Sequence, residues 1–204
     1  MNIGIDIDDT IANTSEMLLA FAQKYNFEEL KREIKLDKEK VLGIHGFRTL
    51  TEAFNWTPKE IENYKIRYQD YIGQNANIKP LAKEVIQKLK EEGHSIIIVT
   101  SRGIDGDKFS DPYEIAKKIL DMHNITYDKL IARCTDKLIV CKENDIEVFI
   151  DDRETHCKKV AEGGIYTIMM SGPHNINISD ENLDRAYSWV DIYYKIRNYM
   201  EKEC

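Results

Sequence analysis

Three acidic residues stand within four positions near the start of the chain, Asp6, Asp8 and Asp9, and Thr10 follows them directly. Carboxylates this close together repel one another and shift their own pKa values unless positive charge lies nearby. A hard divalent cation is the usual partner, because Mg²⁺ prefers oxygen ligands and commonly takes one or two carboxylates together with a substrate phosphate. The spacing therefore indicates metal-assisted chemistry on a phosphate group.

A short apolar run opens the chain and leads into these acids. Its length and its polar boundaries predict a buried β-strand, so that Asp6 and Asp8 stand at the carboxyl end of that strand. In open parallel α/β sheets ligands bind at this edge. The position of the acids thus favours chemistry over a role in solubility.

Residues 94–99 form a β-branched run that is apolar on both faces, as a central parallel strand requires, and Thr100, Ser101 and Arg102 follow it. These polar side chains are expected at the same edge of the sheet as Asp6. Arg102 is suited to a charge-assisted contact with an anion.

A further buried strand is predicted at residues 146–150, and it ends in the paired acids Asp151 and Asp152. This pair would bring one or two more carboxylates to the edge that holds Asp6 and Asp8. Metal binding is therefore expected from residues far apart in the sequence.

The motif Asp6-x-Asp8-x-Thr10 after an apolar strand resembles the first signature of the haloacid dehalogenase superfamily of phosphotransferases. The resemblance implies that Asp6 is the nucleophile, which attacks phosphorus and forms an aspartyl-phosphate. It implies that Asp8 protonates the leaving alcohol and later activates water. The residue after the second Asp is often Gly in this superfamily, and Asp9 departs from that pattern.

The resemblance also assigns the later motifs. It implies that Thr100 hydrogen-bonds a phosphate oxygen, and we group Ser101 and Arg102 with it as phosphate-binding residues. A Lys in the interval after a short strand at residues 130–132 would neutralise the nucleophile and the phosphate. Lys137 is favoured, because Asp-Lys after such a strand matches the deoxyribonucleotidase branch, and Lys142 is the alternative. Mg²⁺ would be the cofactor, with the ligand candidates Asp6, Asp8 (through its backbone carbonyl), Asp151 and Asp152.

The element pattern predicts an α/β fold, a doubly wound five-stranded parallel sheet of the Rossmann-like, haloacid dehalogenase type. About seventy residues of mostly helical character separate the first strand from the next, far more than an ordinary connection needs. We therefore expect a helical cap at residues 14–78 and a catalytic core formed by residues 1–13 and 79–204.

Composition limits the classes of partner. The chain has 204 residues, 32% of them charged, and a formal net charge of −7, which disfavours a nonspecific grip on nucleic acid or on an anionic membrane. The first strand begins almost at Met1, and no apolar run approaches the roughly 18 residues of a membrane span, so we expect a cytoplasmic protein. The four cysteines lack Cys-x-x-Cys spacing, and His156 beside Cys157 is far short of a zinc ligand set.

The motifs resemble the cytosolic 5'-nucleotidase group, which includes the 5'(3')-deoxyribonucleotidases. The leading hypothesis is thus a Mg²⁺-dependent phosphomonoesterase acting on nucleoside or deoxynucleoside monophosphates. A phosphatase of another small phosphate ester or of polynucleotide ends is an alternative. A receiver-type signalling domain is a third hypothesis, but its paired acids would lie on the first strand and it would lack the long insert.

Two surface features carry expectations about binding. Phe47 lies in the glycine-flanked segment 43–48 and is the best candidate in the insert for stacking on a base, although an aromatic residue at helical spacing is more often buried packing. A terminal helix is expected at about residues 180–202, with an apolar stripe that packs on the core or forms a homodimer face: Leu183, Tyr187, Val190 and Tyr194.

Overall fold

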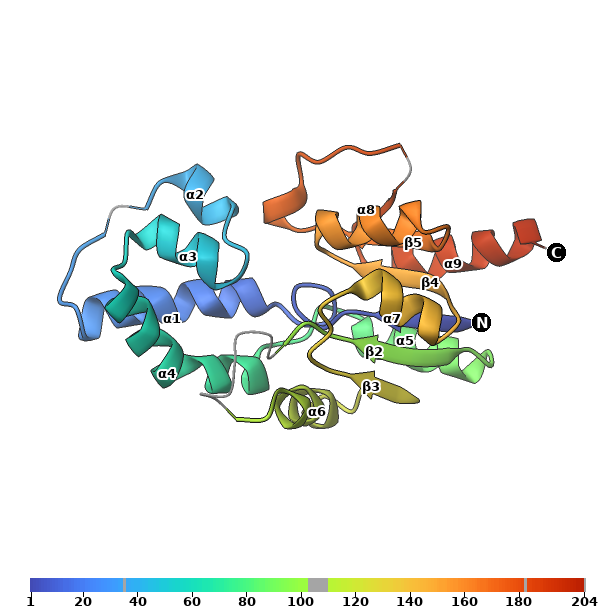
Figure 1. Cartoon of the computed structure of the whole chain (residues 1–204), viewed down its shortest axis with the longest axis horizontal. Helices are drawn as coiled ribbons and strands as arrows, with labels where there is room; N and C mark the ends of the chain where they lie inside the picture. The colour runs from blue at the N-terminus through green and yellow to red at the C-terminus, as the bar shows by residue number, and fades with distance from the viewer. Residues whose placement is uncertain (35, 103–109, 182, 204) are drawn as a thin grey trace.

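A six-stranded parallel sheet organises the chain in the computed structural model, which describes residues 1–34, 36–102, 110–181 and 183–203. The strand order is β3-β2-β1-β4-β5-β6, so β1 lies between β2 and β4 (Figure 1). The strands are β1 (Asn2–Ile5), β2 (Ser95–Val99), β3 (Lys129–Ile131), β4 (Ile146–Asp151), β5 (Tyr166–Met170) and β6 (Asp184–Ala186). The expected Rossmann-like α/β fold is confirmed.

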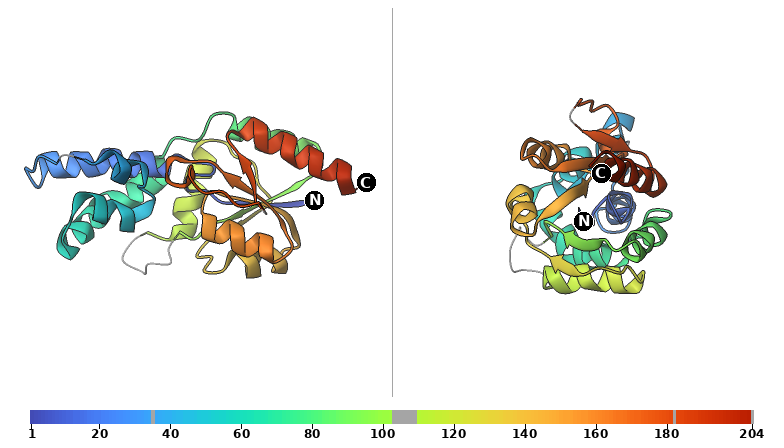
Figure 2. Two further views of the ribbon diagram at one scale, coloured as in Figure 1. Left: turned by 90° about the horizontal axis from the view of Figure 1, so that it is seen from above. Right: turned by 90° about the vertical axis from the view of Figure 1, so that its right-hand side faces the viewer.

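Helices cover both faces of the sheet, because its central strands are apolar on both faces. One face packs against α5 (Ala82–Glu91), α6 (Pro112–Met122) and α9 (Trp189–Glu203), and the other against α7 (Lys137–Glu143) and α8 (Glu154–Glu162) (Figure 2). Alternation along β2 shows this directly, since Ile96 and Ile98 join the first core and Ile97 and Val99 join the second.

Gly4 in β1 makes room for side chains of β4 on the face of the sheet that α7 and α8 cover. A Cβ atom at this position would lie 2.8 Å from Ile146 Cδ1 and 3.1 Å from Phe149 Cδ2. The absent side chain lets these two larger residues of β4 fill the space beside the strand that leads to Asp6.

The sixth strand is the difference from the five-stranded expectation. β6 pairs with β5 at the edge of the sheet, and its sequence Asp-Arg-Ala offers no apolar run from which a strand could be predicted. The terminal helix therefore begins only at Trp189, not near residue 180.

The buried face of α9 also differs from the predicted stripe. Trp189, Ile192 and Ile196 are fully buried against the core, whereas Tyr187 and Tyr194 are 69% and 60% exposed. Leu183 and Tyr187 precede the helix, and Val190 is 40% exposed, so the predicted stripe is wrong. Whether the exposed side of α9 pairs two copies of the chain stays a prediction.

Four helices form a second layer beyond the carboxyl edge of the sheet (Figure 1): α1 (Thr14–Glu28), α2 (Lys38–Leu42), α3 (Gly46–Phe54) and α4 (Pro58–Asn75). They enclose an aromatic core of their own, which includes Tyr25, Trp56 and Tyr64. Thr57 and Glu60 form a reciprocal capping box at the start of α4, with Pro58 at the first helical position. We call these helices the helical insert.

The two connections of the helical insert run side by side. Asn13 donates its backbone N–H to the carbonyl of Asn77 at 2.8 Å, and Lys79 donates to Ile11 at 2.7 Å. The insert therefore leaves and rejoins the sheet at one place. The domain boundaries at 13/14 and 78/79 stay predictions. Within the described residues, each helix is too short or too polar to cross a membrane.

Candidate active site

The carboxyl ends of the neighbouring strands β1 and β4 bring the predicted acids together. Carboxylate oxygens of Asp6, Asp151 and Asp152 lie within 4.8 Å of one another, and all three residues are buried. Asp6 continues the pairing of β1, since its N–H donates to the carbonyl of Ile150 at 2.9 Å. The sheet itself thus fixes the backbone from which the Asp6 carboxylate projects.

Lys137 supplies the positive charge of this acid cluster. Its Nζ lies 2.6 Å from Asp6 Oδ1 and 3.6 Å from Asp151 Oδ2, and it also donates to the carbonyl of Val99. Asp136 positions it, because the Asp136 carboxylate caps α7 and so starts the helix at Lys137. Lys142, the sequence alternative, is exposed on the last turn of α7.

Asp8 is bound by a different cation. Arg102 donates to both of its carboxylate oxygens, at 2.9 Å from Nε and 2.6 Å from Nη2, and Thr14 donates to Oδ1 at 2.6 Å. Although burial favours the neutral acid, the ion pair and hydrogen bonds lower the pKa of Asp8. Arg102 also donates to the carbonyl of Gly73 on α4 at 2.8 Å, so it links the sheet loop to the helical insert.

The structure gives Asp9 a positioning role that the sequence did not reveal. Its backbone is left-handed, with φ of 55°, a conformation that glycine adopts without strain and that Asp tolerates. Its carboxylate accepts hydrogen bonds from the N–H and the hydroxyl of Ser15 in the first turn of α1. Asp9 therefore both turns the chain and holds the start of the helical insert.

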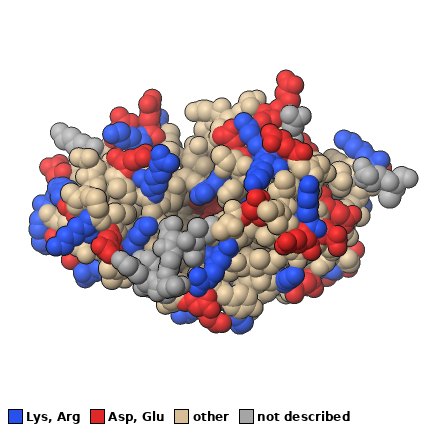
Figure 3. All heavy atoms as spheres, viewed as in Figure 1, with Lys and Arg blue, Asp and Glu red and all other residues tan. Residues whose placement is uncertain are grey.

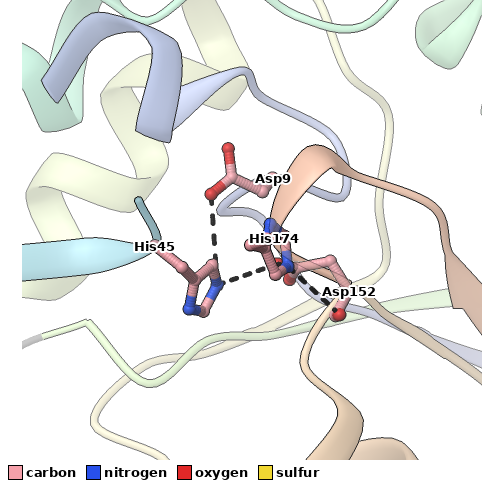
Figure 4. Close-up of side chains that lie close together, drawn as sticks. All are labelled: Asp9, His45, Asp152 and His174. Atoms are coloured by element: carbon pink, nitrogen blue, oxygen red, sulfur yellow. Dashed lines mark hydrogen bonds and ion pairs between the residues drawn. The ribbon is translucent and has the colours of Figure 1, made fainter. Parts of the chain in front are cut away.

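Asp152 faces two histidines, His45 of the helical insert and His174 of the turn after β5 (Figure 4). Its Oδ2 lies 2.9 Å from His45 Nε2 and 3.0 Å from His174 Nε2. Burial opposes ionisation of Asp152, but the histidines outweigh it and lower the pKa of the carboxyl. Burial likewise favours neutral His45, yet Asp152 raises the pKa of that imidazole.

A cavity of about 440 Å³ opens over these acids, between the sheet edge and the helical insert. Figure 3 shows the molecule hollowed between its two lobes, with basic side chains near the opening. Phe47, Ser101 and Arg102 line this cavity together with Asp6 and Asp8. Its size lies in the range of small-molecule sites.

Thr100 and Phe47 differ in how they are held. Thr100 is fully buried, and its hydroxyl accepts the N–H of Arg102 at 3.3 Å.

Phe47 lies in the first turn of α3, which begins at Gly46, so it is not in an irregular segment as expected. It is half-buried, its ring packs edge-on against Tyr64 at 6.2 Å, and Lys65 Nζ lies 4.8 Å from its centroid.

Sequence reasoning missed His45 and His174. Each had a weak signal, since His45 stands in the same glycine-flanked segment as Phe47, and His174 lies in the polar turn that follows the carboxyl end of β5. Only the fold shows that both reach Asp152. His156 and Cys157 were judged too few for a zinc site, yet both contact Asp151. Nδ1 of His156 lies 3.1 Å from Asp151 Oδ2, and the buried Cys157 thiol donates to the Asp151 carbonyl at 3.3 Å.

The acid cluster fits Mg²⁺. Asp6 and Asp151 share the ammonium of Lys137, and burial, with repulsion from the neighbouring acids, raises the pKa of Asp6 to about 8 despite that lysine. An ionised Asp6 therefore calls for further positive charge. The donors are all carboxylate oxygens, which a hard divalent cation prefers.

Comparison with known proteins agrees with this arrangement. Residues 3–110 match the family model described as haloacid dehalogenase-like hydrolase. The chain is 26% identical over 201 residues to a Bacillus subtilis protein named as a nucleotidase, YqfW, covering 97% of this chain and 94% of that protein. It is 23% identical to a nucleotidase of Clostridium acetobutylicum, covering 99% and 96%. The fold resembles a haloacid dehalogenase-like hydrolase of Streptococcus pneumoniae, with a TM-score of 0.67 at 15% identity over 96% of this chain and 97% of that one.

Proposed function

Because this chain belongs to the haloacid dehalogenase-like hydrolases, we propose that it is a Mg²⁺-dependent phosphomonoesterase that acts on nucleoside or deoxynucleoside 5'-monophosphates. The buried Asp6–Lys137 pair at the floor of the cavity carries this proposal. Asp6 attacks phosphorus, the bond to the leaving alcohol breaks, and water then hydrolyses the aspartyl-phosphate. Lys137 stabilises the charge on the phosphoryl oxygens and on Asp6.

Arg102 connects phosphate binding to the protonation of Asp8. In the structure this guanidinium holds Asp8 ionised, whereas the leaving alcohol requires a proton from it. A phosphate dianion in the cavity competes with Asp8 for Arg102, because both are bidentate acceptors. When Arg102 turns to the phosphate, Asp8 loses the charge that lowers its pKa and can take up the proton that it later donates.

We propose that Asp6, the backbone carbonyl of Asp8 and an acid of the Asp151–Asp152 pair hold Mg²⁺. The ion supplies a Lewis acid that orients the phosphate and neutralises the carboxylates. Removal of Mg²⁺ with EDTA is expected to lower kcat/KM by at least about 100-fold, because several kcal/mol of charge stabilisation is lost. Readdition of Mg²⁺ should restore the rate. Full activity in exhaustive chelator would contradict this assignment.

The helical insert is proposed to act as a cap that selects the substrate. Phe47 stands at the cavity wall above the acids, where its ring face can stack on a base. The names of the two relatives, from Bacillus subtilis and Clostridium acetobutylicum, support a nucleotide as the substrate. The net charge of −7 and the cavity bounded by α1, α3 and α4 favour a mononucleotide over a polynucleotide end.

Replacement of Phe47 by Ala is expected to lower kcat/KM for a nucleoside monophosphate by about 5- to 150-fold, because stacking on one base contributes about 1–3 kcal/mol. A small phosphate ester without a base should be hydrolysed at the wild-type rate. Phe21→Ala is the matched control, because Phe21 is also half-buried and packs against Tyr68 and Tyr71 in the helical insert. Equal losses on both substrates would show that Phe47 only packs the insert.

The experiment that tests the proposed function is a Mg²⁺-supplemented panel of phosphate esters. It compares nucleoside and deoxynucleoside 5'-monophosphates, sugar phosphates, a featureless ester and a 5'-phosphorylated oligonucleotide, with kcat/KM as the measurement. The highest value is expected for a mononucleotide. A preference for the oligonucleotide or for a sugar phosphate would overturn the substrate class while leaving the phosphomonoesterase chemistry intact.

A further inference from the structure

Four potential metal ligands from four separate segments converge beside the acid cluster. They are Asp9 after β1, His45 between α2 and α3, Asp152 after β4, and His174 in the 3₁₀ turn η1 (Pro173–Asn175) after β5 (Figure 4). One ligand atom from each lies within 4.8 Å of all the others. Asp9 and Asp152 are buried and the two histidines are mostly buried.

The contacts within this cluster differ from those of a hydrogen-bonded ion pair. Nε2 of His45 and Nε2 of His174 both approach Asp152 Oδ2, at 2.9 and 3.0 Å, and the two rings stack with centroids 4.2 Å apart. Oδ2 is buried, and among the described residues no donor reaches it in hydrogen-bonding geometry. Nε2 of His174 lies 3.4 Å from the Asp152 carbonyl. Both imidazoles thus approach one buried oxygen without an aligned hydrogen bond, and a cation among these atoms would give the oxygen and both nitrogens a common partner.

We propose that Asp9, His45, Asp152 and His174 form a second binding site, for a first-row transition-metal ion of the Zn²⁺, Mn²⁺ or Co²⁺ class, which adjoins the Mg²⁺ site at Asp152. Imidazole nitrogens suit these ions, whereas Mg²⁺ prefers oxygen donors and retains water. Two nitrogens and two carboxylates match the ligand types and the number that Zn²⁺ commonly takes. Asp152 stands between the two sites, with Oδ2 toward the histidines and Oδ1 accepting from Thr10 at 3.3 Å.

The location gives the proposed ion a structural consequence. His45 belongs to the helical insert, whereas Asp152 and His174 belong to loops of the sheet. An ion bound by all of them joins the insert to the sheet across the cavity. Metal binding is therefore expected to raise the melting temperature and to hold the insert closed over Asp6.

The test measures metal binding and uses no substrate, so its failure is distinguishable from failure of the proposed function. Full-length protein is stripped with chelator, equilibrated with excess Mg²⁺ and titrated with Co²⁺, which reports imidazole and carboxylate ligation through its visible absorption. Bound metal is then counted by elemental analysis after desalting, and Zn²⁺ is tested by competition. Wild type is expected to keep one equivalent of Co²⁺ in excess Mg²⁺ and to gain thermal stability from it.

His45→Gln and His174→Gln are each expected to weaken Co²⁺ binding by about 100-fold or more. Loss of a group that only hydrogen-bonds a metal ligand already costs about 10–100-fold. The glutamines keep much of the side-chain volume, and circular dichroism checks that both variants fold. His123→Gln is the matched control, because His123 contacts the carbonyl of Ala76 outside the cluster. Displacement of Co²⁺ and Zn²⁺ by Mg²⁺, or binding unchanged in both histidine variants, would overturn the proposal in favour of a simple imidazolium–carboxylate pairing.

Discussion

Asp6→Asn is expected to lower kcat by at least about 10⁴-fold on every phosphate ester, because an amide cannot form the aspartyl-phosphate. The fold should persist. Burial raises the pKa of Asp6 to about 8, so a neutral side chain of the same shape avoids the desolvation cost of the carboxylate, while it gives up the ion pair with Lys137. The melting temperature of the metal-free variant should stay close to that of wild type, because relief of the buried carboxylate opposes the loss of the ion pair with Lys137.

Acid-quenched mass spectrometry provides the direct measurement for Asp6. Wild type mixed with substrate should carry one phosphate on the peptide that contains Asp6, and the variant should carry none. Asp128→Asn is the control, because Asp128 binds the N–H of Ile96 at the start of β2, the opposite end of that strand from the site. Substantial turnover by Asp6→Asn, with contamination excluded, would show that the covalent mechanism is wrong.

Lys137→Ala is expected to lower kcat/KM by about 10³-fold for nucleotides and for featureless phosphate esters alike. Lys137 stabilises charge that every phosphoryl-transfer transition state carries, and one such preorganised donor is worth about 10²–10³-fold. Its loss also removes the ammonium 2.6 Å from Asp6 Oδ1, so Asp6 is more often protonated and less nucleophilic.

Stability must be separated from catalysis in this variant, because removing one member of a buried ion pair costs about 3–5 kcal/mol. Lys137→Met retains the apolar stem and should fold more stably than Lys137→Ala while remaining equally inactive. Lys142→Ala is the matched control on the same helix and should match wild type, since Lys142 is exposed. If Lys137→Ala kept near-normal activity and Lys142→Ala were inactive, Lys142 would be the lysine that stabilises the phosphoryl charge.

The sheet was largely predictable because each strand that positions the site is an apolar run that ends in polar residues. β1, β2 and β4 follow this rule, and the rule alone places Asp6, Thr100 and Asp151 at one edge. β6 breaks it, since two of its three residues are charged and its pairing depends on β5 already being in place. Local sequence therefore does not specify that strand.

Sequence alone could locate only those site residues that directly follow a predictable strand. The resemblance favoured Lys137 over Lys142 from the Asp-Lys after a short strand, and this Asp-Lys proves to be the start of α7, but the partners of Asp152 had no such signal. His45 and His174 are 129 residues apart by number and meet through the packing of the helical insert over the loop after β5. The sequence showed that Asp9 departs from the family pattern. Its role became clear only from its backbone angle and its hydrogen bonds to Ser15.

The central place of β1 in the sheet determines the order in which the chain can assemble. Ile3 pairs with Ile96 on one side and with Val148 on the other, so the first strand synthesised waits for partners more than ninety residues away. Contacts among α1, α3 and α4, by contrast, fall within about sixty residues, and local contacts form faster than distant ones. The helical insert is thus expected to fold during synthesis before the sheet closes, and the apolar segment that precedes Asp6 stays unpaired and open to aggregation until β2 and β4 are made.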